Sequence, residues 1–211
     1  MAEIISRLET IYPEGSCALE AEGDPFRLLV MAILSAQCTD KRVNEVSGPL
    51  FRRYPDANAF AEAEQEELEN EIRSCGLYRA KARNLRLCAQ RIRDVYGGKV
   101  PSAMDDLLTL PGVGRKVANL IRGDVFGLGG IVADTHCIRI CGLLGFSDGK
   151  DPYKTELALT PLVPLEKQSA FCHRMVQYGR DVCIARRPQC SGCALKDLCR
   201  FGNREENAVC S

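Results

Sequence analysis

The chain has 211 residues, with 28 Lys and Arg side chains balanced by 28 Asp and Glu, and 45% of its residues are hydrophobic. This length and composition are typical of a globular protein with one compact domain or two small ones. The most apolar stretch, residues 26–36, is too short to cross a membrane, and the N-terminus shows no basic region before an apolar run. We therefore expect no membrane segment, no secretory signal and a cytoplasmic location.

The net charge of zero hides an uneven distribution along the chain. Residues 1–74 contain 15 acidic and seven basic side chains, whereas residues 75–150 contain six acidic and 12 basic ones. A zero net charge argues mildly against nucleic-acid binding. A molecule divided in this way can nevertheless present a basic face to a polyanion.

Helical patterns follow one another along the chain without strand-like alternation, so we predict an all-α fold. The expected helices span residues 3–12, 25–34, 41–53, 59–63, 64–75, 80–96, 102–109, 115–126, 151–162 and 164–180, and another starts after Asp134. Asp24 and Pro25 form a cap and first-residue pair, and Ser102 with Asp105 resembles a capping box. The helix after Asp24 is apolar on nearly every side, which predicts a central place in the core.

Two loops in the first half contain side chains that a core does not require. Ser35-Ala36-Gln37-Cys38-Thr39-Asp40 follows the apolar helix, and either Thr39 or Asp40 can cap the next helix. Gln37 has either a functional role or a local one, as a loop amide bonded to nearby backbone. Gly76 could hold Leu77 out on a loop, although an apolar side chain usually packs inward.

The stretch Leu110-Pro111-Gly112-Val113-Gly114-Arg115-Lys116 organises the whole chain. Pro111 ends one helix, Gly112 and Gly114 make a tight turn, and a second helix starts at about Arg115. This helix-hairpin-helix aims backbone N–H groups outward from a helix N-terminus. Such groups bind a phosphate oxygen without reading a base edge. An ordinary glycine-containing turn is the alternative interpretation.

Lys116 is a candidate amine nucleophile, and Asp134 is a candidate functional carboxylate. The positive end of the helix dipole disfavours an ammonium in the first turn, so we expect Lys116 to have a lowered pKa, as an amine nucleophile needs. A solvated surface lysine is the alternative. Asp134 can act as an N-cap and still be a functional carboxylate, because capping keeps it ionised. His136 follows it and is more often a structural partner than a catalyst in such a place.

Four of the 12 cysteines form a compact pattern near the C-terminus, Cys183-x6-Cys190-x2-Cys193-x5-Cys199. Four thiolates can bind either Zn²⁺ or a cubane iron–sulfur cluster. The pattern has a single CxxC pair and a long first spacing, which favours a [4Fe-4S] cluster over zinc. Most of the other eight cysteines lie in apolar helical context and are expected to be small buried hydrophobes.

Together these motifs resemble the endonuclease III family of helix-hairpin-helix DNA glycosylases. The resemblance covers nearly the whole chain in order, through residues 35–40, 76–78, 110–116, 134–136, 179–180 and the four-cysteine loop. It implies two helical domains flanking a DNA-binding cleft. One is a six-helix barrel over residues 22–132, and the other joins residues 1–21 to 133–211 and carries the cluster.

The resemblance also implies a bifunctional DNA glycosylase and abasic-site lyase of base excision repair. A monomer, working in the cytoplasm at a bacterial or archaeal nucleoid, would act on double-stranded DNA that contains damaged pyrimidines or abasic sites. The damaged base is flipped out, Lys116 attacks the sugar C1′, and Asp134 helps to take the amine proton and stabilises positive charge on the sugar. A Schiff base then permits β-elimination, which nicks the strand 3′ to the lesion.

Other residues receive roles through the same resemblance. Gln37 and Leu77 would fill the gap left by the flipped base. The residues implied to contact DNA are Gln37, Thr39, Leu77, Leu110, Gly112, Val113, Gly114, Arg115, His136 and Arg180. The four cysteines would hold a cluster whose role is structural or redox-linked and not hydrolytic.

Two residues differ from the usual pattern of the family, and two alternative functions compete with the proposed one. Tyr178 stands where the family often has His, and Cys137 stands where a branched apolar residue is usual, which bears on lesion preference. A monofunctional adenine-mismatch glycosylase typically lacks the lysine at the place of Lys116. A non-catalytic DNA-binding iron–sulfur module would need neither Lys116 nor Asp134. The presence of both residues favours the bifunctional enzyme.

Overall fold

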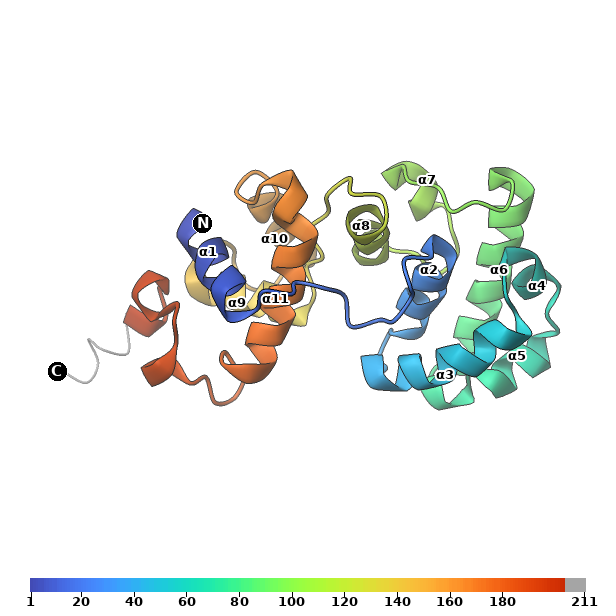
Figure 1. Ribbon diagram of the computed structural model, residues 1–211, viewed down its shortest axis with the longest axis horizontal. Helices are drawn as coiled ribbons and strands as arrows, with labels where there is room; N and C mark the ends of the chain where they lie inside the picture. The colour runs from blue at the N-terminus through green and yellow to red at the C-terminus, as the bar shows by residue number, and fades with distance from the viewer. Residues whose placement is uncertain (204–211) are drawn as a thin grey trace. The chain divides into compact units, whose positions relative to one another are not determined.

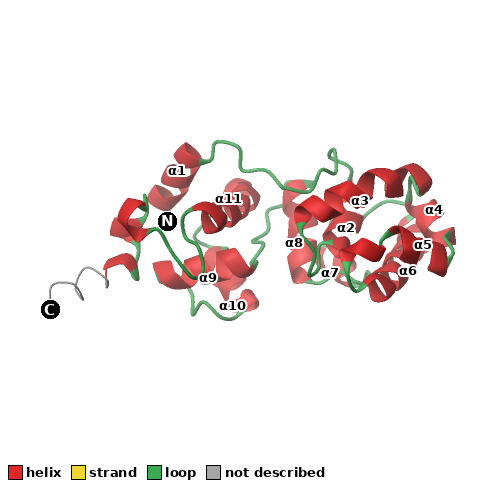
Figure 2. Ribbon diagram, turned by 90° about the horizontal axis from the view of Figure 1, so that it is seen from below, coloured by secondary structure: helices red, strands yellow, loops and turns green. Residues whose placement is uncertain are grey.

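A computed structural model of the chain describes residues 1–203. Helices, turns and loops account for all of this part of the chain, and no strand occurs in it, as the colouring of Figure 2 shows. The predicted all-α fold is therefore confirmed. The end of the expected cluster domain, residues 204–211 with Cys210, lies outside the described residues.

The described helices keep the order expected from the sequence, with small shifts at their ends. The α-helices are α1 (Ala2–Ile11), α2 (Pro25–Leu34), α3 (Asp40–Arg53), α4 (Ala57–Glu62), α5 (Gln65–Glu71), α6 (Tyr78–Tyr96), α7 (Met104–Leu108), α8 (Arg115–Asp124), α9 (Thr135–Leu144), α10 (Pro152–Leu159) and α11 (Gln168–Asp181). The 3₁₀ turns are η1 (Arg73–Cys75), η2 (Leu165–Lys167), η3 (Cys190–Gly192) and η4 (Lys196–Leu198). None of the described helices is long and apolar enough to span a membrane.

Side-chain caps explain where several of these helices begin. The carboxylate of Asp24 accepts the N–H groups of Phe26 and Arg27, and Thr39 caps α3 by accepting the N–H of Arg42. The predicted capping box of Ser102 is wrong, because α7 begins at Met104, behind a residue that provides no side-chain cap. The carbonyl of Ser102 instead accepts a hydrogen bond from Arg122 in α8. These local hydrogen bonds determine the residue at which each of these helices begins.

The chain packs as two compact units. The first joins Met1–Cys17 to the chain from Gly127 onward, and the second is Ala18–Phe126. The predicted hairpin therefore belongs to the second unit, whereas Asp134 and the four cluster cysteines belong to the first. The domain limits expected from the sequence, a six-helix barrel over 22–132 and a cluster domain over 1–21 with 133–211, stay a prediction.

Helix α2 forms the centre of the second unit. All seven residues from Leu28 to Leu34 are buried, and the helix packs against α3, α6 and α8. A helix that is apolar all round can only be stable when it is surrounded in this way. Each large side chain in it contributes about 1.5–3 kcal/mol by leaving water. The central place predicted for this helix is confirmed.

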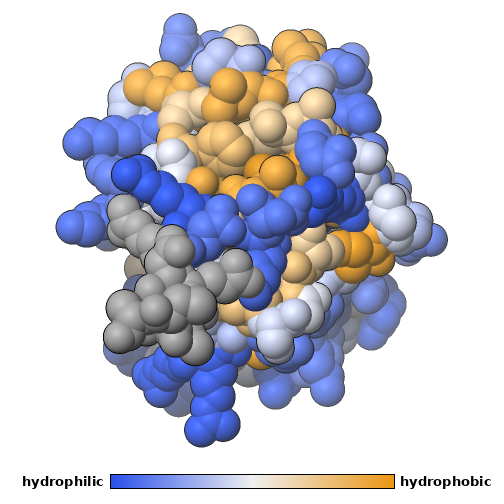
Figure 3. Space-filling model, turned by 90° about the vertical axis from the view of Figure 1, so that its left-hand side faces the viewer, coloured by the Kyte–Doolittle hydropathy of each residue, from blue (hydrophilic) through white to orange (hydrophobic). Residues whose placement is uncertain are grey.

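Helix α11 plays the corresponding role in the first unit. It packs against both α1 and α9, which lie beside it in Figure 1, although α1 is more than 150 residues away in sequence. The face of the molecule drawn in Figure 3 mixes apolar areas with a band of hydrophilic side chains. The Tyr178 ring on α11 is buried and meets the Tyr12 ring edge-on, with centroids 6.4 Å apart. The N-terminal segment is thus an integral part of the unit that contains the cysteine loop.

Candidate functional site

The predicted hairpin is present between α7 and α8. Gly112 adopts φ +83°, a left-handed conformation that other residues avoid, and a Cβ there would lie 3.1 Å from the Cβ of Asn84. Both the turn and the close approach to α6 therefore require glycine at this place. Gly114 has an extended backbone and forms the N-cap of α8. The two glycines thus have different tasks in the same turn.

The hairpin presents backbone and cationic groups to solvent, not apolar side chains. The side chains of Leu110 and Val113 are buried, so these two predicted contact residues can offer a ligand only their main chain. Gly112, Gly114, Arg115 and Lys116 are exposed. Helix α8 begins without a side-chain cap, in contrast to α2, α3, α4, α9 and α10. Its first turn therefore has the positive potential and the amide groups that favour an anion.

Two other predicted contact residues share an uncommon backbone conformation. Gln37 has φ 53° and Leu77 has φ 46°, and Glu22 is the third non-glycine residue with positive φ in the described chain. The Gln37 side chain is exposed, and Leu77 is 58% exposed. The alternative that Leu77 packs inward is therefore wrong. Thr39, also predicted to contact DNA, uses its hydroxyl to cap α3.

In the other unit, Asp134 is held by contacts to both carboxylate oxygens. Its Oδ1 accepts the Cys137 N–H at 2.8 Å, so the predicted N-cap of α9 is confirmed. Its Oδ2 lies 3.0 Å from Nδ1 of His136. The side chain of Asp134 is 13% exposed and that of His136 is 28% exposed. Local bonds therefore fix the orientation of the carboxylate before any ligand arrives.

His136 is positioned in turn by a glycine on the neighbouring helix. A Cβ on Gly179 of α11 would lie 2.6 Å from Cδ2 of the His136 ring, so only glycine allows the ring to pack there. This contact explains the glycine of the Gly179-Arg180 pair. Arg180 follows it in the last turn of α11 and is exposed.

The four predicted metal ligands lie on one loop and share one pocket. Cys183, Cys190, Cys193 and Cys199 line it together with Leu143, Val182 and Phe201. None of the cysteines in the described chain forms a disulfide. Four cysteine side chains outside any disulfide, gathered around one pocket, are the donor set that a cubane iron–sulfur cluster or a structural Zn²⁺ site requires. The residues present therefore fit a metal group.

Hydrogen-bond donors point at the sulfur atoms of this pocket. The Tyr178 hydroxyl lies 2.8 Å from Sγ of Cys193, and Nη1 of Arg139 lies 3.4 Å from Sγ of Cys183. Burial raises the pKa of the Cys183 thiol, whereas its bond to the Arg139 guanidinium lowers it. Donors of this kind stabilise thiolates, the form of cysteine that binds metal. Tyr178, one of the two departures from the family pattern, thus contacts a predicted ligand.

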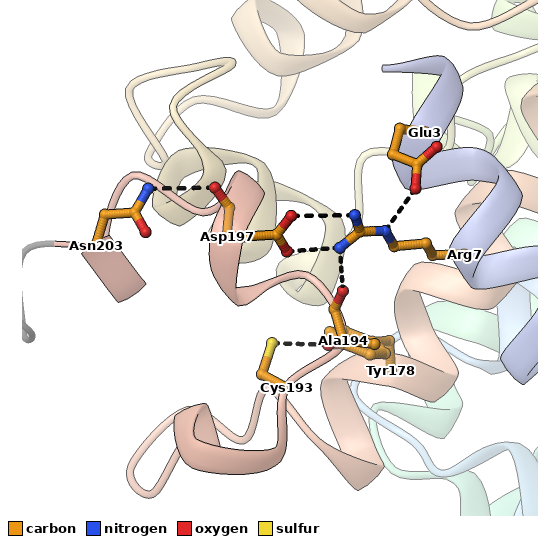
Figure 4. Close-up of polar contacts among 7 residues, drawn as sticks. All are labelled: Glu3, Arg7, Tyr178, Cys193, Ala194, Asp197 and Asn203. Carbon is orange, nitrogen blue, oxygen red and sulfur yellow. Dashed lines mark hydrogen bonds and ion pairs between the residues drawn. The ribbon is translucent and has the colours of Figure 1, made fainter.

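An arginine from the N-terminal helix fastens the cysteine loop (Figure 4). Arg7 of α1 donates from Nη1 to the Ala194 carbonyl at 2.7 Å and from Nη2 to Asp197 Oδ2 at 3.0 Å. Glu3, one turn earlier, accepts from Nε of the same guanidinium. The bond to Arg7 lowers the pKa of the Asp197 carboxyl. A planar fork of donors suits this joint recognition of a carboxylate and a carbonyl.

Sequence reasoning missed the supporting residues Arg7, Lys81 and Arg139. Lys81 is the one with a readable signal, since it shares the buried stripe of α6 with Leu85, Cys88 and Ile92. A lysine at helical spacing with buried apolar residues must find polar partners inside the protein. Arg7 and Arg139 gave no such signal, because their partners lie 190 and 44 residues away. Cys137, the other departure, is simply buried, with its Sγ 4.0 Å from that of Cys141.

Comparison with known proteins places these features in a family. Residues 30–164 match the model of the HhH-GPD superfamily base excision DNA repair protein. The endonuclease III of Synechocystis sp. (strain ATCC 27184 / PCC 6803 / Kazusa) is 44% identical over 93% of this chain and 90% of its own length. The endonuclease III of Bacillus subtilis (strain 168) is 39% identical over 96% of this chain and 92% of its own length.

Solved structures agree with these relatives. The structure of a trapped endonuclease III–DNA covalent intermediate superposes with a TM-score of 0.89 and 41% identity, covering 96% of this chain and 95% of that one. A non-covalent endonuclease III–DNA complex gives a TM-score of 0.90 at 40% identity, covering 97% of this chain and 95% of that one. The chain therefore belongs to the HhH-GPD superfamily of base excision DNA repair proteins and, within it, to the endonuclease III family.

Proposed function

We propose that this chain excises oxidised pyrimidines from double-stranded DNA and then cleaves the abasic site, with Lys116 as the nucleophile. Membership of the endonuclease III family makes it a DNA glycosylase and abasic-site lyase. The observation that supports the assignment to Lys116 is its place, exposed in the first turn of α8 directly after the hairpin. A DNA strand gripped by the hairpin would therefore pass beside an amine.

The grip needs no base recognition. The amide groups at the uncapped start of α8 bind phosphate oxygens, and the exposed Arg115 adds a cationic contact. Such contacts set the register of the backbone and leave the choice of lesion to the pocket that receives the flipped base. Gln37 and Leu77, exposed on their strained loops, fill the space that the base vacates.

The chemistry follows from the amine and the carboxylate. The neutral amine of Lys116 forms a bond to C1′ while the C1′–N bond breaks, and the base departs with that electron pair and gains a proton. The Asp134 carboxylate stabilises the positive charge that develops on the sugar and accepts the proton lost by the amine. The C1′–O4′ bond then breaks, O4′ gains a proton, and C1′ becomes the carbon of a protonated Schiff base with Lys116. This Schiff base acidifies the C2′ hydrogen, and loss of that proton expels the 3′-phosphate by β-elimination.

Within this proposal, Cys183, Cys190, Cys193 and Cys199 hold a [4Fe-4S] cluster. The shared pocket, the absence of disulfides at these cysteines and the Tyr178 and Arg139 contacts to their sulfur atoms support this ligand set. When bound, the cluster supplies a covalent cross-link of the loop and a redox centre, and no hydrolytic chemistry. Arg7 and Tyr178 contact the cysteine loop and hold it in position, together with its basic side chains. The enzyme acts as a monomer in the cytoplasm, at the nucleoid of a bacterial or archaeal cell.

A duplex with a single thymine glycol tests the proposal. The expected result is release of the modified base together with a strand nick that requires no later treatment. If the base is released but the strand breaks only after hot alkali, the chain is a monofunctional glycosylase. If neither event occurs and the duplex is merely bound, the chain is a non-catalytic module. Either of these results would contradict the proposed reaction.

A further inference from the structure

The two exposed loop residues Gln37 and Leu77 lack the usual reason for their conformation. Positive φ is unfavourable for residues with a side chain, and burial normally compensates for it. Here both side chains face solvent, and Leu77 exposes more than half of its apolar surface. Two residues with side chains thus adopt positive φ without burying those side chains.

One buried side chain contacts the backbone behind both loops. Lys81 is only 4% exposed, and its Nζ donates to the carbonyl of Leu34 at 2.7 Å and to the carbonyl of Cys75 at 2.7 Å. Leu34 is the last residue of α2, three residues before Gln37. Cys75 is the last residue of η1, two residues before Leu77. A single ammonium thus joins the ends of two helical segments just where the two strained loops leave them.

The chemistry of this contact suits a fixed link. The last carbonyls of a helix have no partner within the helix and carry its partial negative charge, so a cation there is favourable. Burial lowers the pKa of the Lys81 ammonium, which shows that its charge is costly to keep inside the protein. A methionine or leucine would fill the same space at lower cost. The described partners of the Lys81 ammonium are main-chain carbonyls, so the geometry that it imposes acts on the backbone at these two helix ends.

We infer that Lys81 is a positioning residue for base flipping: by holding the Leu34 and Cys75 carbonyls on one ammonium, it sets the spacing at which Gln37 and Leu77 enter the DNA stack together. The inference rests on the proposed function, since it assigns Lys81 an effect on the entry of these two side chains. Lys81 itself touches neither DNA nor the reacting atoms. Its loss should affect steps that require entry into the stack and spare the chemistry at C1′.

The test compares two substrates under single-turnover conditions. A duplex with one thymine glycol requires flipping and gap filling, whereas a single-stranded oligonucleotide with one abasic site requires neither. Lys81→Met, which keeps the length but removes the donors, should slow cleavage of the duplex by about tenfold or more and change cleavage of the single strand by less than about twofold. Lys99→Met, on an exposed lysine of the same unit, is the matched control and should change neither rate.

A second background separates positioning from general destabilisation. In a Gln37→Ala/Leu77→Ala protein the positioned side chains are gone, so adding Lys81→Met should slow duplex cleavage by no more than about twofold further. Equal slowing on both substrates, or an undiminished effect in this background, would overturn the inference. If Lys81→Met does not fold, Lys81→Gln replaces it, and loss of folding in both variants would also overturn it. A wild-type protein inactive on both substrates would refute the proposed function itself, and the inference with it.

Discussion

The carboxylate of Asp134 and the imidazole of His136 face each other across the first turn of α9, with Oδ2 and Nδ1 3.0 Å apart. The second oxygen of Asp134 accepts the N–H of Cys137 and caps the helix. The Asp134 side chain thus caps α9, and the same contacts orient its carboxylate for the proposed reaction. The two roles can be tested separately, because the cap needs only a hydrogen-bond acceptor whereas the reaction needs the negative charge.

Asp134→Asn should separate the cap from the charge. Asparagine caps helices about as well as aspartate, so the free energy of unfolding should change by less than about 0.5 kcal/mol. The glycosylase rate should fall by about 100-fold, because the charge that stabilises the sugar cation is removed. Asp134→Ala should lose the cap as well, at a further cost of about 1 kcal/mol. Denaturant unfolding and single-turnover rates measure both effects, and equal destabilisation by Asn and Ala would contradict this account.

Gly112→Ala should damage the hairpin. The alanine would have to adopt φ +83° and place its Cβ against Asn84, so we expect a loss of about 1–2 kcal/mol in stability and weaker binding to undamaged duplex DNA. Gly192→Ala is the matched control, since no atom lies within 4 Å of a Cβ added at Gly192 and its φ is not positive. That change should be neutral or stabilising by up to about 1 kcal/mol. Tight DNA binding by Gly112→Ala would show that the turn geometry is not what grips phosphate.

Arg7→Met should loosen the cysteine loop. Removing the guanidinium leaves the Ala194 carbonyl and Asp197 without their link to α1, so a chelator should strip iron from the loaded protein several-fold faster. Arg27→Met removes an exposed ion pair with Glu22 in the other unit and should have little effect. Visible absorbance during exposure to the chelator gives both rates. Identical rates for the two variants would refute the role of Arg7.

The thiol next to Lys81 should react only at high pH. Burial, with smaller contributions from the charge of the neighbouring Cys38 thiolate and from the hydrogen bond to Cys38, raises the pKa of Cys75 to about 11. At pH 8 only about one molecule in a thousand would carry the thiolate that attacks iodoacetamide. Alkylation of Cys75, followed by mass spectrometry, should therefore accelerate up to about pH 11. A rate that levels off near pH 9 would show that the thiol is not held in this buried environment.

The features that the sequence predicts well are those controlled by neighbouring residues. The apolar run before Ser35 marks a buried central helix, and Asp24, Thr39 and Asp134 mark helix starts that the structure confirms. The hairpin glycines and the cysteine spacing are equally local. The capping box at Ser102 fails because the hydroxyl does not bond to the start of α7, which lies two residues further on. A short helix packed against α8 can begin without a cap, since packing stabilises it.

The supporting contacts could not be predicted, because they join residues that only the fold brings together. Nothing near Arg7 indicates Asp197, and nothing near Tyr178 indicates that its hydroxyl meets Cys193. The orientation of Leu77 is a different case, since sequence alone left both the inward and outward positions open. Gly76 and Leu77 both adopt positive φ, which the glycine permits, but the positive φ of Leu77 itself has no signal in the sequence. The roles assigned to the site residues stay predictions.

The measurement that tests the central claim most directly is borohydride trapping of the Schiff base on a duplex with one thymine glycol. Wild type and Lys99→Gln should each give a covalent protein–DNA product, because reduction converts the imine at C1′ into a stable amine. Lys116→Gln should give none, while still binding the duplex. If Lys116→Gln forms the covalent product as wild type does, another amine is the nucleophile and the assignment of Lys116 is wrong.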